Sequence, residues 1–479
     1  MVISLNKLKT FFINFTIVLS SSFVLQLIKM IFNIYISNKI SSEALGVFGL
    51  IMTTYMFGIT LASAGLNITC MKIVAEEIAL RNINSAKKAS IKCTIIGLIS
   101  GIAIGILFCI NSKFISLYCI HNKIQNNIIY LISIALPLIA MSSSINGYFM
   151  AIRKVKTNVI GSFIEQLSKI IFTYIYLKYI NLNNINDICY ALILGDVFSE
   201  IISFIYLFFA YFFNLKINFT KKSKMIKKNA FSFNVNKKIY RILIPIALTS
   251  YLRSGISTIK QSLIPYSLER SGLNCAKSLS NYGIISGMSL PIIMFPAIFL
   301  GIFANLFIPE FSTYYAKNDY YKIKKYTHKL IILTFIFSCI ISIIFWNFGT
   351  KIGIIIYKNI YVGNFIKIFS LIIPFIYIDI IIDNILKGID AQTKSMFINI
   401  IDLIITTSFI YFCVPILGIK GYIVSIFLSE ILNFILSLIV LLKIEKNFQT
   451  NNQTIKLLID LFISMCYIVF ILEEGIDKI

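Results

Sequence analysis

Apolar runs long enough to cross a lipid bilayer recur along the whole chain and constrain its fold more than any other feature. A spanning helix needs about 20 predominantly apolar residues, and lipid cannot hydrogen-bond the backbone, which leaves only helices or closed barrels. The runs lack the residue-by-residue alternation of a membrane barrel. We expect an all-α integral membrane protein of 13 spans, within a range of 12 to 14, near residues 10–36, 44–66, 90–110, 124–150, 157–180, 186–213, 241–266, 279–306, 329–348, 364–386, 395–413, 420–442 and 455–472.

Composition agrees with a membrane protein. The 479 residues are 58% hydrophobic and 13% charged, whereas soluble domains are about 45–50% apolar and about 25% charged. A net charge of +24 would suggest nucleic-acid binding in a soluble protein, but these cations lie in short loops between apolar runs, so we expect no nucleic acid. The nine cysteines form no CxxC pair and the two histidines are far apart, so we expect no disulfide framework and no metal site.

The distribution of lysine and arginine predicts the orientation in the membrane. With the N-terminus inside, the inner segments hold 29 of the 44 cations, the outer segments hold 10, and five lie within spans. Cytoplasmic loops carry such an excess of positive charge. The sequence therefore predicts a multi-pass protein of the cytoplasmic (inner) membrane with a cytoplasmic N-terminus. The most basic link, 214–240, is expected to be a cytoplasmic connector, either as a plain topology signal or as a segment attracted to anionic lipid.

The two halves of the chain share an internal repeat. A shift of 237 residues places Pro137 on Pro374 and Glu165 on Asp402. A shift of 230 residues then places Ser199-Glu200-Ile201 on Ser429-Glu430-Ile431. Because acids and prolines fall in corresponding spans, we interpret the halves as structural repeats that run in the same direction.

The repeat predicts two six-helix lobes related by a pseudo-two-fold axis along the membrane normal. We expect the N-lobe at residues 1–213, the basic connector at 214–240, the C-lobe at 241–443 and about one extra C-terminal helix within 444–479. Transporters built from parallel repeats place their substrate between the lobes and rock one lobe against the other.

Cations within two predicted spans point to an anion-binding site. Arg253 lies about halfway along the span 241–266, and Lys260 follows two helical turns later on the same face. A charge at that depth costs a few kcal/mol or more, so it is usually kept for a function. In the first span, three polar residues at i, i+3 and i+7 share a face. The candidate substrate-binding residues are therefore Arg253, Lys29, Lys260, Gln26 and Asn33. For the two lysines, the alternative is that each reaches the outer interface.

Acidic residues within the first six spans are candidates for ion coupling. Glu165 and Lys169 are spaced i, i+4 with the acid first, which favours a pair on one helix. Asp196 and Glu200 share a face in the middle of the sixth span, where they could take a proton or Na⁺, or pair with Lys169. Asp196, Glu200 and Glu165 are therefore the candidate coupling residues. Four acids of the second half are not ranked: Asp379, Asp383, Asp402 and Glu430.

Short sequence motifs occur along most of the chain, in the same order as in a known group of membrane proteins. They are Gly65-Leu66-Asn67, Met71-Lys72-Ile73-Val74-Ala75-Glu76-Glu77, Ile145-Asn146-Gly147-Tyr148-Phe149, Leu263-Ile264-Pro265, Leu268-Glu269-Arg270-Ser271-Gly272, Tyr282-Gly283, Gly287-Met288-Ser289-Leu290-Pro291, Phe295-Pro296 and Ile308-Pro309-Glu310-Phe311-Ser312. On these motifs the chain resembles the stage V sporulation protein B group of polysaccharide exporters. That group belongs to the superfamily that also holds multidrug-and-toxin extruders and the lipid II flippase. Asn67 is a departure, because the group usually has proline there.

The resemblance implies an alternating-access flippase or exporter. Its substrate would be an undecaprenyl-diphosphate-linked saccharide or a peptidoglycan precursor, moved across the cytoplasmic membrane in cell-wall or spore-cortex synthesis. In lipid II flippases, arginines on the first span and on early spans of the second lobe line a cationic cavity that holds the diphosphate. Lys29 and Arg253 occupy similar places in this chain. The implied partners are the anionic lipid-linked saccharide, membrane lipids and cell-wall synthesis enzymes, and the protein is expected to act as a monomer.

Two other functions fit the same sequence. A multidrug or organic-cation antiporter of this fold would have a cavity dominated by acids, with its membrane-embedded cations buried in pairs. A non-transporting membrane scaffold for cell-wall enzymes would need no polar cavity. An enzyme is not expected, since the chain lacks the G-x-x-x-x-G-K-[ST] signature of a nucleotide-hydrolysing loop. No cofactor is expected beyond coupling to Na⁺, H⁺ or the membrane potential.

Overall fold

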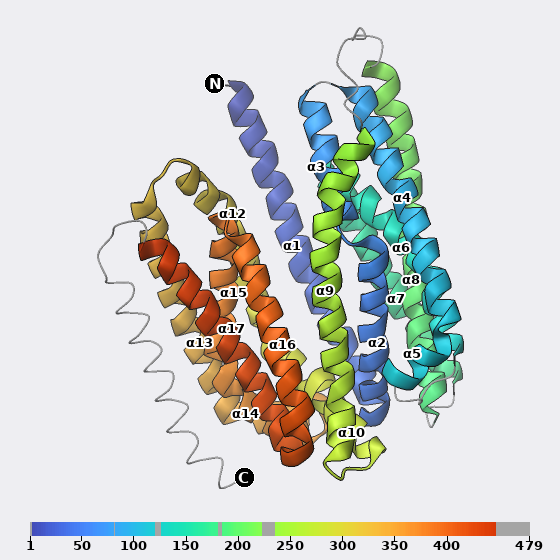
Figure 1. Cartoon of the computed structure of the whole chain (residues 1–479), viewed down its shortest axis with the longest axis vertical. Coiled ribbons are helices and arrows are strands. Elements are labelled where there is room, and N and C mark those ends of the chain that lie inside the picture. The colour runs from blue at the N-terminus through green and yellow to red at the C-terminus, as the bar shows by residue number, and fades with distance from the viewer. Residues whose placement is uncertain (1, 81, 120–125, 181–183, 223–234, 447–479) are drawn as a thin grey trace. The chain divides into compact units, whose positions relative to one another are not determined.

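The fold is all-α, as the apolar runs predict. The structure, a computed structural model, describes residues 2–80, 82–119, 126–180, 184–222 and 235–446. Every regular element in these ranges is a helix (Figure 1). The predicted thirteenth span, 455–472, and the extra C-terminal helix both lie outside the described residues.

Contacts divide the chain into two compact units. Unit 1 comprises Met1–Asn33 and Glu43–Ser262, and unit 2 comprises Ile34–Ser42 and Leu263–Ile479. Two continuous helices pass from one unit to the other: α1 (Val2–Lys39) and α9 (Val235–Arg270). Most of α9 therefore groups with the first unit, although the repeat makes it the first span of the second half. The lobe boundaries read from the sequence stay a prediction.

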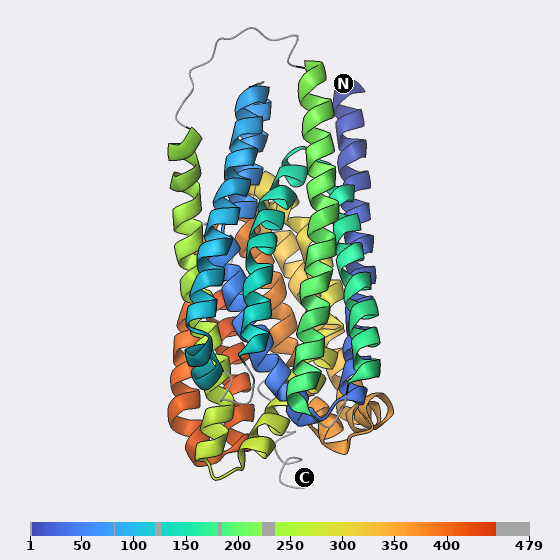
Figure 2. The same cartoon turned by 90° about the vertical axis from the view of Figure 1, so that its right-hand side faces the viewer.

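Unit 1 is built on tight pairing of long helices. Its remaining elements are α2 (Ser42–Ser63), α3 (Leu66–Ala79), α4 (Ile83–Ile110), α5 (Ser112–Cys119), α6 (Asn127–Ala151), α7 (Val155–Tyr179) and α8 (Ile185–Lys222). Helix α4 packs along α6, and α7 packs along α8 (Figure 2). The first pair is close because α4 presents Gly97, Gly101 and Gly105 to α6; a Cβ at Gly101 would lie 2.5 Å from the Cα of Pro137. Small residues spaced in this way let helix backbones approach within a membrane.

Unit 2 has helices of the same kind in the second half of the chain. They are α10 (Cys275–Tyr282), the π-helix η2 (Gly283–Ser289), α11 (Leu290–Met294), α12 (Ala297–Ala316), α13 (Tyr320–Tyr357), α14 (Ile360–Phe369), the 3₁₀ turn η3 (Ser370–Ile372), α15 (Ile373–Gly388), α16 (Gln392–Leu417) and α17 (Ile419–Lys446). Asp319 caps α13, accepting a bond of 3.3 Å from the backbone N–H of Lys322. Helices α13 and α14 meet at two glycines, Gly353 and Gly363, whose backbones touch.

Eleven helical stretches of the described chain are long and apolar enough to cross a membrane. Helix α7, the fifth predicted span, is not among them because Glu165 and Lys169 interrupt its apolar character, yet its 25 residues are long enough. The eighth predicted span, 279–306, is not one helix. It begins as α10, continues through η2 and α11, and is broken at Phe295-Pro296 before α12. Proline removes a backbone donor and clashes with the preceding turn, which ends the helix there.

Equivalent contacts in the two units agree with the repeat. A Cβ at Gly105 of α4 would lie 2.8 Å from the carbonyl oxygen of Ser133 on α6. In unit 2 the hydroxyl of Ser342 on α13 donates to the carbonyl of Ser370 over 2.7 Å. Both residues of the second contact lie 237 positions after their counterparts in the first, which is the shift of the sequence repeat. At this contact the two halves use the same register, with a glycine in one and a hydrogen-bonding serine in the other.

A left-handed glycine separates α2 from α3. Gly65 has φ = 78°, a conformation that residues with a Cβ rarely adopt. The chain therefore breaks its helix one residue before Leu66, although Asn67 stands where the resembling group has proline. Gly147 of α6 packs directly against the carbonyl of Asn67, so two of the sequence motifs touch each other.

We predict that Gly353→Ala destabilises the protein. The added methyl group would meet the backbone of Gly363, which cannot swing aside as the end of a side chain could. Overpacking of this kind typically costs about 1–3 kcal/mol. Gly301→Ala is the matched control, because nothing lies within 4 Å of a Cβ at that helical glycine. Thermal unfolding of the purified protein in detergent measures both; equal melting temperatures for the two variants would contradict the close α13–α14 contact.

Candidate functional site

Charged side chains of unit 1 gather within its helices. We call Lys29 of α1, Glu165 and Lys169 of α7, and Asp196 and Glu200 of α8 the charged cluster. Lys169 forms an ion pair with Asp196. The charges of Lys29 and Lys169 both act on Glu165 and on Glu200, so the five side chains form one electrostatic group. The sequence analysis named all five residues. It predicted a substrate-binding role for Lys29 and an ion-coupling role for the three acids.

The ion pair of Lys169 is with α8, not with its own helix. Among the described residues, Lys169 pairs with Asp196, so the predicted pair between Lys169 and Glu165 is wrong. Asp196 is only 6% exposed, and a buried carboxylate needs a partner to offset its lost hydration. Tight packing of α7 on α8 supplies that partner, whereas an i, i+4 pair would leave Asp196 alone. The alternative prediction, a pair between Asp196 and Lys169, is confirmed.

Small residues and aromatic rings bring α7 and α8 together at this depth. Gly195, next to Asp196, packs against the side chain of Thr173. About two turns further along α8, the hydroxyl of Ser203 donates to the carbonyl of Gly161 over 3.3 Å. The rings of Phe172 and Phe198 stack with their centroids 5.2 Å apart. The ion pair therefore lies in a packed helix–helix interface.

The charged cluster is acidic by one formal charge. Its three carboxylates contribute −3 and its two lysines contribute +2, which leaves −1. Tyr55 of α2 is buried beside the three acids, and its hydroxyl has no hydrogen-bond partner among the described residues. One oxygen of Asp196, Oδ2, is likewise buried without such a partner. One proton or one monovalent cation would neutralise this group of charges.

The other two candidate cations lie on one face of α9. At about 100° per residue, both lie roughly opposite Tyr251 around the helix. The Tyr251 hydroxyl donates to the carbonyl of Leu61 on α2 over 3.0 Å, so the two cations point away from that contact. Gln261, between the two faces, accepts from Thr53 of α2 over 3.0 Å. Arg253 is exposed.

Arg253 differs from the other candidate cations in its surroundings. No acidic side chain within the described part of the chain pairs with it, whereas Lys29 is close to acids and Lys260 is half-buried. On α1, Gln26 and Lys29 are exposed and Asn33 is half-buried. The substrate role of each residue stays a prediction.

Unit 2 holds acids that the sequence did not rank. Both carboxylate oxygens of Asp402 accept from the hydroxyl of Ser429 over 2.9 Å. Asp383 accepts from Ser395 and pairs with Lys387 over 2.6 Å, an i, i+4 pair visible in the sequence. Since Glu165 and Asp402 are repeat partners, the two halves satisfy equivalent acids differently, with lysines in unit 1 and a serine in unit 2.

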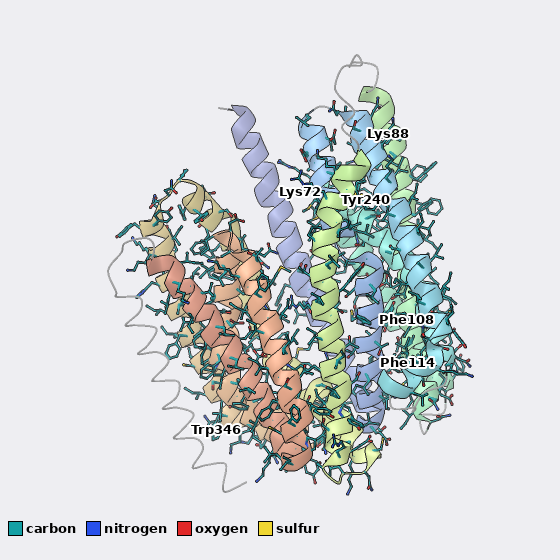
Figure 3. The ribbon with its side chains drawn as sticks, viewed as in Figure 1. Lys72, Lys88, Phe108, Phe114, Tyr240 and Trp346 are labelled. Atoms are coloured by element: carbon teal, nitrogen blue, oxygen red, sulfur yellow. The ribbon has the colours of Figure 1, made fainter. Side chains whose placement is uncertain are left out.

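One end of unit 1 is strongly basic. Figure 3 shows Lys72 of α3 and Lys88 of α4 at the upper end of this unit, while Phe108 and Phe114 lie toward its lower end. This polarity agrees with the positive-inside count. In unit 2, the ammonium of Lys367 lies 4.8 Å from the ring centroid of Trp346, an arrangement typical of an interfacial cation–π contact.

We predict that Lys169→Ala is strongly destabilising, by roughly 3–5 kcal/mol, because Asp196 would remain buried without its cation. A double-mutant cycle with Asp196→Ala should give a larger coupling energy than a cycle with Glu165→Ala. Lys178→Ala, a lysine exposed near the end of the same helix, is the control. Thermal unfolding in detergent measures each variant. Equal coupling in the two cycles would contradict the assignment of the ion pair.

The sequence matches known protein families. The sequence profile of the polysaccharide biosynthesis protein family matches residues 12–252, and the MatE profile matches residues 245–412. The chain is 20% identical to stage V sporulation protein B of Bacillus subtilis (strain 168) over 432 residues, which cover 88% of this chain and 82% of that protein.

Solved structures share the fold. An inward-facing multidrug resistance MATE family transporter of the MOP superfamily superposes with a TM-score of 0.65 at 14% identity, covering 89% of this chain and 95% of the other. A MOP superfamily transporter from Pyrococcus furiosus superposes with a TM-score of 0.60 at 14% identity, covering 92% of this chain and 95% of the other.

Proposed function

We propose a function from the premise that this chain belongs to the polysaccharide biosynthesis protein family of the MOP superfamily, as a multi-pass membrane transporter. The proposed activity is the alternating-access transfer of an undecaprenyl-diphosphate-linked saccharide or peptidoglycan precursor across the cytoplasmic membrane. The N-terminus would be cytoplasmic, and the protein would carry out transport without enzymatic chemistry. The similarity to stage V sporulation protein B supports a place in cell-wall or spore-cortex synthesis.

The surroundings of Arg253 support this proposal most directly. This residue is an exposed arginine within a membrane-length helix, and no described acid neutralises it. A guanidinium binds phosphate through two parallel hydrogen bonds, so a diphosphate is a fitting partner. Lys260, two turns along the same face, would add a second positive charge to the same ligand. The polar residues of α1 that the sequence named would contribute less, because Lys29 is already engaged with acids.

The charged cluster would couple transport to a cation. Its formal charge of −1 fits the uptake of one proton or one Na⁺, and Asp196 Oδ2 is a buried oxygen without a described partner. Glu165 and Glu200 would share the positive charges of Lys29 and Lys169. Cation uptake would change the balance of charge within unit 1, which is the kind of local event that biases two conformations.

An organic-cation antiporter is the second candidate, and a specific observation favours it. A cavity rich in acids with its cations buried in pairs was expected for that function, and Lys169 is paired with Asp196 beside two further acids. The MATE-like structures also fit it. In the Pyrococcus furiosus transporter, reverse polarity of the binding pocket suggests a different function.

We predict that Arg253→Ala reduces transport of a fluorescent undecaprenyl-diphosphate-linked saccharide in proteoliposomes by about 10- to 100-fold. Hydrogen bonds to charged groups contribute about 1.5–3 kcal/mol, and about 1.4 kcal/mol corresponds to tenfold. Arg253→Lys should fall between, since lysine keeps the charge but not the bidentate geometry. Arg241→Ala on the same helix is the control. Wild-type transport by Arg253→Ala would refute the site.

The second candidate makes a different prediction for the same reconstituted protein. If organic cations are the substrate, ethidium transport is detectable, survives in Arg253→Ala and falls at least about tenfold in Glu200→Gln, which removes an acid from the charged cluster. If the lipid-linked saccharide is the substrate, ethidium transport is absent from the wild type. Measuring both substrates in parallel separates the two functions.

A further inference from the structure

Most of α9 is attached to unit 1 along its length. Its first 28 residues, Val235–Ser262, group with unit 1, whereas Leu263–Arg270 group with unit 2. The sequence repeat alone would assign the whole helix to the second half. The contacts that hold it to unit 1 are spread along the helix, from Lys238 near its start to Gln261.

An ion-pair contact holds the beginning of α9. The ammonium of Lys238 lies 2.9 Å from Glu76 Oε1 and 3.4 Å from Glu77 Oε1. Both acids belong to α3, at the end of the motif that starts at Met71. The side chain of Glu77 is only 12% exposed, so this part of the contact is shielded from water. One lysine therefore bridges two adjacent carboxylates.

The next contact lies at the break between α2 and α3. Gly65, with its left-handed backbone, faces α9 so closely that a Cβ there would lie 3.2 Å from Cδ1 of Leu243 and 3.3 Å from Cβ of Ile246. The glycine thus serves two purposes: it turns the chain, and it leaves room for α9. Deeper along α9, Gly255 packs near the ring of Phe57, 3.7 Å from the position of a Cβ.

Two hydrogen bonds complete the attachment. The hydroxyl of Tyr251 donates over 3.0 Å to the carbonyl of Leu61, in the last turn of α2, where helices leave carbonyls without a partner. The hydroxyl of Thr53 donates over 3.0 Å to Gln261 Oε1. Within lipid no water can replace these partners if the helices separate.

We propose that Val235–Ser262 of α9 moves with unit 1 as one body during transport. The attached positions, 238 to 261, span about 35 Å at about 1.5 Å per residue, enough to cross the roughly 30 Å core of a bilayer. If α9 moved with unit 2, each cycle would break the Lys238 ion pairs and both hydrogen bonds. The inference rests on the proposed transport function only in requiring that the two units move. It assigns Arg253 to the moving body that also holds the charged cluster.

Distances between spin labels in the full-length protein in lipid nanodiscs test this without a substrate. Labels on non-natural ketone amino acids avoid the nine native cysteines. Three pairs of exposed positions are compared. Ile99 with Ile171 is the reference within unit 1, Ile99 with Leu252 reports on α9, and Leu252 with Phe412 crosses to unit 2. Double electron–electron resonance gives the width of each distance distribution.

We expect the Ile99–Leu252 distribution to be as narrow as the Ile99–Ile171 reference and narrower than Leu252–Phe412. An Ile99–Leu252 distribution as wide as Leu252–Phe412 would overturn the proposal, whatever the absolute widths. Because no transport is measured, this outcome is separate from failure of the proposed substrate.

Variants test whether the named contacts hold the helix. Combining Lys238→Gln, Tyr251→Phe and Gln261→Leu removes the ion pairs and both hydrogen bonds, and should widen the Ile99–Leu252 distribution toward that of Leu252–Phe412. Arg241→Gln, which changes an exposed cation three residues after Lys238, should leave the width unchanged. An unchanged width in the triple variant would show that these contacts do not attach α9, and would overturn the proposal.

Discussion

Lipid provides no partner for a charge or a backbone group, and the rest of this structure follows from that constraint. Helices satisfy the backbone within each segment. A buried charge needs a partner, and the ion pair between Lys169 of α7 and Asp196 of α8 is where this need is clearest. Helix α7 carries an acid and a lysine in its middle, and it fits within a membrane because α8 and α1 place opposite charges beside it. Leaving either charge unpaired would cost several kcal/mol.

Close helix packing is what makes such pairing possible. Glycine and serine bring the backbones of α4 and α6, of α7 and α8, and of α13 and α14 together. Because the two halves share a register, a glycine contact at Gly105 reappears as a hydrogen bond from Ser342. The repeat-related acids differ in chemistry: Lys29 and Lys169 act on Glu165, whereas Asp402 accepts from Ser429. This asymmetry gives unit 1 its charged cluster and fits a division of roles between the halves.

Much of the fold could be predicted from the sequence, because hydropathy is a local property. The apolar runs predicted the helices, and α7 was found despite its charges because its length and flanks were those of a span. The eighth predicted span is irregular in a way that composition does not reveal, with a π-helix at Gly283–Ser289 and a break at Phe295-Pro296. In the candidate site, spacing along one helix pointed to Glu165 as the partner of Lys169. Packing of α7 on α8 chose Asp196 instead.

The sequence by itself determined the class of the protein. Apolar length, the bias of lysine and arginine, and the repeated acids and prolines all add up from neighbouring residues, so they predict a two-part helical membrane protein and name its charged candidates. The tertiary structure decided which charges meet. Lys29 belongs with the acids of α7 and α8, Arg253 stands apart from every described acid, and most of α9 is attached to unit 1. The physical reason is that a pair such as Lys29 and Glu165, or Lys238 and Glu76, depends on which helix faces come together across more than a hundred residues of chain.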